Sequence, residues 1–184
     1  MGHVNLQQTP LAGLCLVQSM ARVDQRGRFE RLYCEQALAP LHPGLRVAQA
    51  NLSTTRGRGA LRGLHYQGPP GLEAKLVRCL HGRVFDVAVD LRAGSATFLR
   101  WHAVELAGEL SLFIPEGFAH GFQLLSDEAQ LLYFHTAAWN PDCEGGLRYD
   151  DPALAIGWPL PVTTISARDR AHPLLGAQFE GIPT

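Results

Sequence analysis

The chain has 184 residues, of which 46% are hydrophobic and 18% are charged. This length and balance are typical of one globular domain with a sizeable core, and we expect a single domain over residues 1–184. The formal net charge of −1 provides no bulk attraction to nucleic acid or to an anionic membrane surface. We therefore expect neither of them as a partner.

The four cysteines, Cys15, Cys34, Cys79 and Cys143, are scattered and form no C-x-x-C pair. The first residues lack a basic segment followed by an apolar core, and no apolar run approaches the roughly 20 residues that span a bilayer. The sequence therefore predicts reduced thiols in a cytoplasmic protein.

Nineteen glycines and twelve prolines separate short apolar runs, a rhythm typical of an all-β sandwich or barrel. In chain order, we expect a strand at 14–17, a short helix near 34–38, strands at 84–91, 101–106, 110–114 and 130–136, and a C-terminal segment from 159 that crosses back over the barrel.

The clearest strand signal is the period-two alternation of residues 84–91. One face of this strand is wholly apolar, whereas the other carries Asp86 and Asp90. His81 and Gly82 immediately precede it and predict a turn.

Lys75 is the only lysine in the chain, against fifteen arginines. A lysine ammonium is a compact charge with a tunable pKa, whereas arginine stays charged and presents a planar fork. Arg62, His65 and Lys75 fall within fifteen residues, which suggests a site that handles an anion and a proton. The competing interpretation is that arginine dominance reflects genome composition and that one lysine remains by chance.

Residues 114–122 read Ile-Pro-Glu-Gly-Phe-Ala-His-Gly-Phe, a turn that leads into a strand presenting His120. This segment resembles the second motif of the cupin superfamily, a small double-sheet barrel. Metal-binding cupins draw two histidines and an acid from a first motif, but here that region offers only His65, followed by Tyr66 and Gln67. Because this is a poor donor set, we expect no metal.

A more specific resemblance rests on motifs that occur in a fixed order, at residues 24–27, 61–67, 75–78, 84–90, 114–122, 132–133, 151–152 with 158–159, and 165–169. Together they resemble the dTDP-4-dehydrorhamnose 3,5-epimerase family over about residues 11–175. The resemblance implies an all-β, cupin-type double-sheet barrel of jelly-roll form, with a few short helices.

The resemblance also implies a substrate, a dTDP-linked 4-keto-6-deoxyhexose, and a reaction. The C4 ketone acidifies the hydrogens at C3 and C5, so removal of a proton and return from the opposite face inverts each centre. His65 matches the base, Asp169 the carboxylate that orients it, Tyr133 the proton donor, and Lys75 the charge that stabilises the enolate. No redox cofactor or metal is expected. The competing interpretations are a core histidine, a surface acid and a packing tyrosine.

Further positions match the family's substrate-binding residues: Arg26, Gln49, Asn51, Arg62, His120, Glu144 and Arg168. The arginine fork suits the oxygens of a diphosphate. The family is dimeric, with an N-terminal segment that reaches the neighbour, so a homodimer is expected. The implied product is a precursor of rhamnose in cell-surface polysaccharide such as lipopolysaccharide.

Two positions depart from the family pattern: Phe134 replaces a common lysine, and Ala138 replaces a tyrosine that lines the pocket, although Trp139 could supply an aromatic wall. The departure at Ala138 leaves one alternative open, an epimerase that inverts one carbon of another nucleotide 4-keto-deoxysugar. A second alternative, from a different class, is a non-catalytic nucleotide-sugar-binding cupin. A metal-dependent cupin oxygenase or isomerase is a more distant alternative.

Overall fold

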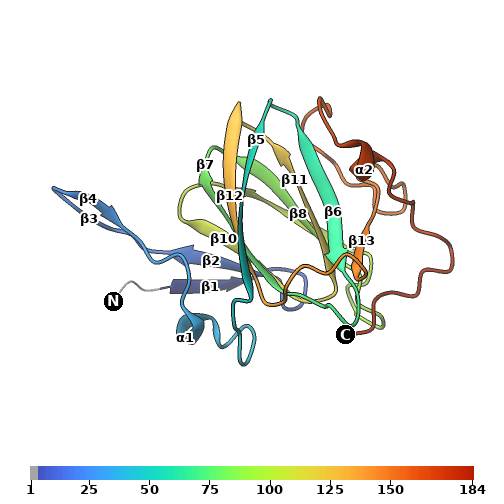
Figure 1. Cartoon of the computed structure of the whole chain (residues 1–184), viewed down its shortest axis with the longest axis horizontal. Coiled ribbons are helices and arrows are strands. Elements are labelled where there is room, and N and C mark those ends of the chain that lie inside the picture. Colours follow the sequence, from blue (N-terminus) through green and yellow to red (C-terminus); the bar gives the residue numbers. More distant parts are fainter. Residues whose placement is uncertain (1–3) are drawn as a thin grey trace.

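The computed structural model describes residues 4–184, which form two facing antiparallel sheets (Figure 1). The six-stranded sheet has the order β1 (Val4–Gln8), β2 (Cys15–Ser19), β10 (Leu110–Ile114), β7 (Lys75–His81), β12 (Glu128–His135) and β5 (Gln49–Arg56). The five-stranded sheet has the order β13 (Glu144–Gly146), β6 (Leu61–Gln67), β11 (Phe118–Leu124), β8 (Val84–Asp90) and β9 (Trp101–Leu106).

This double-sheet barrel confirms the predicted fold class. The expected strands appear as β2, β8, β9, β10 and β12, and the expected helix is α1 (Glu35–Leu38). The only other α-helix in residues 4–184 is α2 (Ala167–Arg170). No helix in this part of the chain has the length and apolar character needed to cross a membrane.

The main core fills the space between the two sheets. Strand β8 contributes to this core although it carries two acids, Asp86 and Asp90. Val84 and Ala88 on its more polar face pack in this interior core, so Asp86 also points into the barrel. Val87 and Val89 on the other face pack in a second cluster. Both faces of β8 are thus buried, and the acids must find partners inside the protein.

The C-terminal segment covers the outer face of the five-stranded sheet. Trp158, Leu175 and Ile182 pack against the second cluster, and the Ile182 amide donates to the Leu91 carbonyl at 2.6 Å. The prediction that this segment crosses back over the barrel is therefore confirmed.

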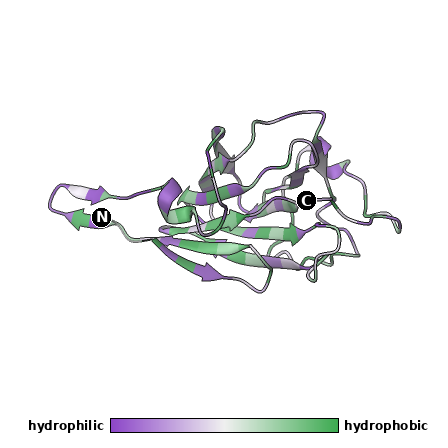
Figure 2. Cartoon of the chain, turned by 90° about the horizontal axis from the view of Figure 1, so that it is seen from below, coloured by the Kyte–Doolittle hydropathy of each residue, from purple (hydrophilic) through white to green (hydrophobic). Residues whose placement is uncertain are grey.

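Strands β3 (Arg22–Asp24) and β4 (Gly27–Phe29) form a separate two-stranded hairpin. It projects away from the barrel, as Figures 1 and 2 show from two directions. Val23 and Phe29 are each 76% exposed on this hairpin, although both are apolar. The hairpin therefore lacks a partner within its own chain for these side chains.

Candidate active site

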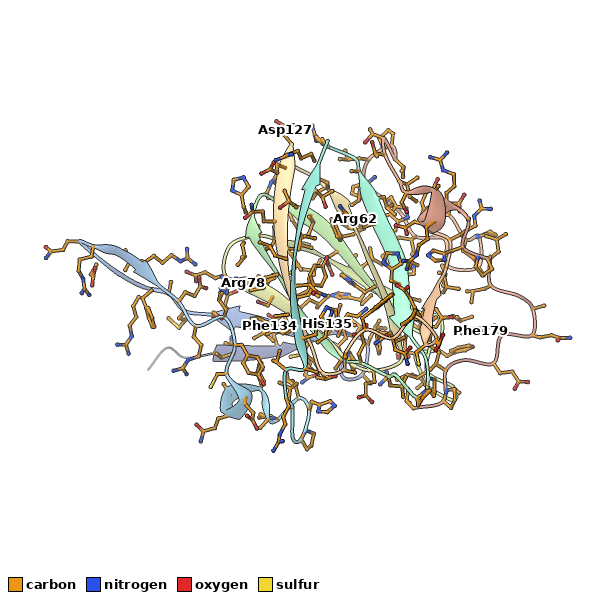
Figure 3. All side chains as sticks on the ribbon, in the orientation of Figure 1. Arg62, Arg78, Asp127, Phe134, His135 and Phe179 are labelled. Atoms are coloured by element: carbon orange, nitrogen blue, oxygen red, sulfur yellow. The ribbon has the colours of Figure 1, made fainter. Side chains whose placement is uncertain are left out.

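A cavity of about 270 Å³ opens between the two sheets. Both sheets contribute to its wall, and Figure 3 labels one residue from each, Arg62 on β6 and His135 on β12. The six-stranded sheet supplies Asn51, Ser53, Lys75, Tyr133 and His135, the five-stranded sheet supplies Arg62, His65, Tyr66, Gln67, His120, Gly121, Phe122 and Glu144, and connecting segments supply Glu73 and Trp139.

His65 on β6 is joined to Asp169 on α2, and this pair was predicted as base and orienting acid. The imidazole Nε2 lies 2.9 Å from Asp169 Oδ1, while Oδ2 accepts from the Gly63 amide at 3.1 Å. The Ser166 hydroxyl caps α2 by accepting from the Asp169 amide at 2.9 Å, which fixes the position of the carboxylate.

Burial of Asp169 by itself would raise its pKa, but the hydrogen bonds from His65 and the Gly63 amide outweigh this effect and lower the pKa to about 2. The carboxylate is therefore ionised at neutral pH and can only accept, so His65 Nε2 carries the proton that it shares with Asp169. His65 Nδ1 has no hydrogen-bond partner within residues 4–184 and is available to a ligand.

Close contact between β6 and β11 places two histidines side by side. Gly63 has a φ of +120°, and a Cβ on it would lie 2.6 Å from the Gly121 Cα. Glycine at both positions is therefore required for the strands to approach this closely. As a result, His65 and His120 are directly paired across the two strands.

His120 is bound to a buried acid that the sequence analysis did not assign to the site. Its Nε2 lies 2.9 and 3.0 Å from the two carboxylate oxygens of Asp86, and both side chains are buried. The signal for Asp86 was the polar face of an alternating strand, but the pattern could not say which partner it would meet.

Tyr133 on β12 packs edge-on against His120, with the ring centroids 6.0 Å apart. Burial raises the pKa of the Tyr133 phenol, and the negative charge of Asp86 raises it further. The hydroxyl is therefore protonated at neutral pH, as a proton donor must be.

Lys75 lies at the start of β7, where its side chain is buried and lines the cavity. Its Nζ is 3.1 Å from Glu73 Oε1, while Glu73 Oε2 binds His135 Nδ1 at 2.7 Å. Burial alone would raise the pKa of Glu73, but His135 and Lys75 together lower it. Glu73 and His135 were missed in the sequence. His135 lies two residues after Tyr133 on the same strand and so on the same face, a signal that could have found it, whereas Glu73 precedes β7 and carried no such signal.

The predicted binding residues fall into three groups. Arg62, Asn51, His120 and Glu144 line the cavity. Gln49 and Arg168 do not: Gln49 Oε1 accepts from the Trp139 amide at 2.9 Å, and Arg168 forms an ion pair with Glu144 and lines an adjoining hollow. Arg26 lies on the projecting hairpin, 84% exposed and paired with Asp24, and the structure does not bring it to the cavity of its own chain.

The two departures from the family pattern have different consequences. Phe134 faces away from the cavity and packs against the Tyr33 ring at 5.5 Å, so the exchange for lysine does not alter the cavity wall. The Ala138 carbonyl accepts from Gln67 Nε2 at 3.3 Å, and Trp139 lines the cavity. The suggested aromatic wall is thus present one residue beyond the missing tyrosine.

His172 is a further residue near the base that the sequence did not indicate. Its Nε2 lies 3.8 Å from Asp169 Oδ1, and its ring packs edge-on against His65 with centroids 5.7 Å apart. Burial lowers the pKa of His172, and the neighbouring His65 lowers it further. This favours a neutral imidazole beside the His65–Asp169 pair.

The cupin-type barrel presents the His65 imidazole from one sheet, with its carboxylate partner on α2, and a phenol and an ammonium from the other sheet. This arrangement is typical of isomerases that move protons by general acid–base catalysis. A family model described as dTDP-4-dehydrorhamnose 3,5-epimerase matches residues 8–177. The chain belongs to this family, and it is an epimerase.

Relatives of two kinds are similar to this chain over most of its length. A dTDP-4-dehydrorhamnose 3,5-epimerase from Salmonella typhimurium is 41% identical over 173 residues, covering 91% of this chain and 93% of that protein. A dTDP-4-dehydrorhamnose 3-epimerase from Streptomyces niveus is 38% identical over 175 residues, covering 94% and 84%.

Among solved structures, a dTDP-6-deoxy-D-glucose 3,5-epimerase from Legionella pneumophila in complex with dTDP-4-keto-L-rhamnose has a TM-score of 0.90 and 39% identity, covering 98% of each chain.

Proposed function

We propose that this chain inverts C3 and C5 of dTDP-4-dehydro-6-deoxy-D-glucose to give dTDP-4-dehydro-L-rhamnose, using its own side chains as base and acid. The observation that carries the proposal is that His65 and Tyr133 enter one cavity from opposite sheets. A sugar ring held between the sheets would have the base on one face and the acid on the other.

In this mechanism, His65 removes the proton next to the C4 ketone, and Asp169 stabilises the resulting imidazolium. The electron pair of the broken C–H bond passes to the ketone oxygen, and the ammonium of Lys75 stabilises this enolate. Tyr133 then delivers its hydroxyl proton to the carbon from the other face. His65 loses its proton to solvent and Tyr133 regains one, after which the same pair acts on the second carbon.

The test is to incubate the protein with dTDP-4-dehydro-6-deoxy-D-glucose in deuterated water and to read the sugar by NMR. Deuterium at both C3 and C5 with inversion supports the proposal. Two results would overturn it. One is deuterium incorporation with no inversion at C3 or at C5. The other is no incorporation although the sugar binds, which would favour the alternative of a non-catalytic nucleotide-sugar-binding protein.

The alternative is inversion at one carbon only. It is favoured by the 3-epimerase from Streptomyces niveus, whose 38% identity is close to the 41% of the 3,5-epimerase from Salmonella typhimurium. Ala138 also favours this alternative, because it replaces a tyrosine that lines the substrate pocket in the family. In the same NMR experiment, deuterium at C3 alone or C5 alone would establish it.

We also propose a homodimer in which the β3–β4 hairpin of one copy covers the sheet of the other. Exposed apolar side chains lie on the hairpin and on the six-stranded sheet. The hairpin carries Val23 and Phe29, and Met20 precedes it; the outer face of the six-stranded sheet carries Leu52 and Leu80. Burying them against a second copy would remove apolar area from water and would bring Arg26 toward the partner's cavity.

Sedimentation equilibrium tests the dimer: a mass of two chains is expected, and Phe29→Glu should shift it toward one chain. A single-chain mass for the unaltered protein would contradict the proposal.

We also propose a cytoplasmic location. The four cysteines Cys15, Cys34, Cys79 and Cys143 are free thiols, which fits a compartment that keeps thiols reduced.

A further inference from the structure

A row of hydrogen bonds crosses three neighbouring strands on the cavity wall of the six-stranded sheet. It begins at Glu73, just before β7, passes to His135 on β12, and ends at Asn51 on β5. His135 Nδ1 lies 2.7 Å from Glu73 Oε2, and His135 Nε2 lies 3.3 Å from Asn51 Nδ2. The His135 ring is also stacked on Tyr133, with centroids 5.9 Å apart.

The chemistry of these groups determines the direction of each hydrogen bond. The Glu73 carboxylate only accepts, so His135 Nδ1 carries the proton. In the neutral ring, Nε2 is then an acceptor and receives a proton from the Asn51 amide nitrogen. A doubly protonated ring would place two donors against each other, unless the Asn51 amide turned over.

Two titratable side chains, Glu73 and Tyr133, contact the His135 ring. Glu73 is the only carboxylate within hydrogen-bond distance of the ring among residues 4–184, and its second oxygen is paired with the ammonium of Lys75 at 3.1 Å. Tyr133, the other titratable neighbour, has a raised pKa and is uncharged at neutral pH. Glu73 thus binds His135 through one carboxylate oxygen and Lys75 through the other.

Asn51 lines the cavity, and its Oδ1 has no hydrogen-bond partner within residues 4–184. We propose that Glu73 and His135 are positioning residues that hold the Asn51 amide with its carbonyl oxygen toward the ligand. This wall of the cavity then recognises a hydrogen-bond donor, either a hydroxyl of the sugar or the imide N–H of the pyrimidine. The inference rests on the proposed function only for the identity of the nucleotide sugar.

The experiment compares His135→Leu, which removes both hydrogen bonds, with His135→Gln, whose amide can donate to Glu73 and accept from Asn51. We expect His135→Leu to raise KM for dTDP-4-dehydro-6-deoxy-D-glucose about 3- to 10-fold, the effect of one neutral hydrogen bond, with kcat changed less than KM. His135→Gln should restore most of the affinity. His102→Leu on β9, outside the cavity, is the matched control and should leave KM unchanged.

A double-mutant cycle separates positioning from packing. If His135 acts through Asn51, then His135→Leu made in an Asn51→Ala background should add less than a twofold change in KM. Additive effects of the two substitutions would overturn the proposal, as would equal KM values for His135→Leu and the unaltered protein. Melting temperatures of all variants show whether each is folded.

Binding of dTDP alone, measured by calorimetry, distinguishes the two donors. Weaker dTDP binding by His135→Leu assigns the contact to the pyrimidine, whereas unchanged dTDP binding with a raised KM assigns it to the sugar. The unaltered protein tests the proposed function separately. If it binds dTDP but does not turn over the sugar, the proposed function is contradicted. The effect of His135→Leu on dTDP binding can still be measured in that case.

Discussion

His65 and His120 are paired across β6 and β11, yet each imidazole is hydrogen-bonded to a different carboxylate, Asp169 and Asp86 respectively. The His65 side chain is 33% exposed, whereas that of His120 is 6% exposed. Only the ring of His65 therefore has ready access to a ligand and to solvent for proton exchange. The pairing places the proposed base, His65, beside a histidine that is fixed in the cavity wall.

Replacement of Asp169 by Asn should lower kcat by roughly 10²- to 10⁴-fold, because the imidazolium formed on His65 would lose its negative partner. Calorimetry with dTDP should give nearly unchanged binding, since the carboxylate is turned toward His65 and Gly63. Asp150→Asn is the control: this acid pairs with Arg148 on the surface and should have no effect on rate. A rate for Asp169→Asn within twofold of normal would refute the role of the pair.

Tyr133→Phe should separate proton removal from proton delivery. His65 can still abstract a proton and return it from the same face, so deuterium exchange with retained configuration should persist while inversion falls by roughly 10²- to 10⁴-fold. NMR of the sugar in deuterated water measures both events. Tyr33→Phe, whose hydroxyl donates to the Leu45 carbonyl away from the cavity, should invert normally. Normal inversion by Tyr133→Phe would require another acid.

Trp139→Ala should act on binding rather than on chemistry. The indole lines the cavity, and its 55% exposure places it at the solvent side, whereas Lys75 is buried. Loss of an aromatic contact worth about 0.5–1.5 kcal/mol should raise KM roughly 2- to 10-fold with kcat nearly unchanged. Trp139→Phe keeps a ring and should be closer to normal. Steady-state kinetics would contradict this role if kcat fell and KM did not change.

Asp90 provides a prediction on acid stability that is independent of catalysis. Its fully buried carboxylate accepts hydrogen bonds from Arg92, Ser95 and Thr97, which outweigh the effect of burial and lower its pKa to about 2. Because this is below the unfolded value of about 3.9, the group stabilises the fold by about 2 kcal/mol above pH 4, and this is lost as the pH falls toward 2.

The measurement is the free energy of unfolding of the unaltered protein and of Asp90→Asn between pH 2 and 7. The difference should be constant from pH 5 to 7 and should shrink below pH 4. A difference that stays constant down to pH 2 would show that the charge of Asp90 does not stabilise the fold. Activity at pH 7 should be retained, since Asp90 is not part of the cavity wall.

The sequence by itself determined several of the strands, among them β2, β8 and β12, and the family to which the chain belongs. The alternation at 84–91 and the motifs around His65, Lys75 and Tyr133 are local patterns, and a strand places alternate residues on one face wherever it is packed. These patterns were sufficient to identify the all-β fold and the family. They also nominated His65 as the base and Tyr133 as the acid, and these two roles stay predictions.

Only the tertiary structure decided which side chains meet. His65 and Asp169 are 104 residues apart in the chain, and Glu73 meets His135 across 62 residues. The period-two pattern of residues 84–91 could not tell whether the polar face of β8 would be exposed to solvent or buried. The sequence likewise could not show that Arg26 lies outside the cavity of its own chain. These contacts depend on strand order and register, which are set by the packing of the whole barrel and not by any one segment.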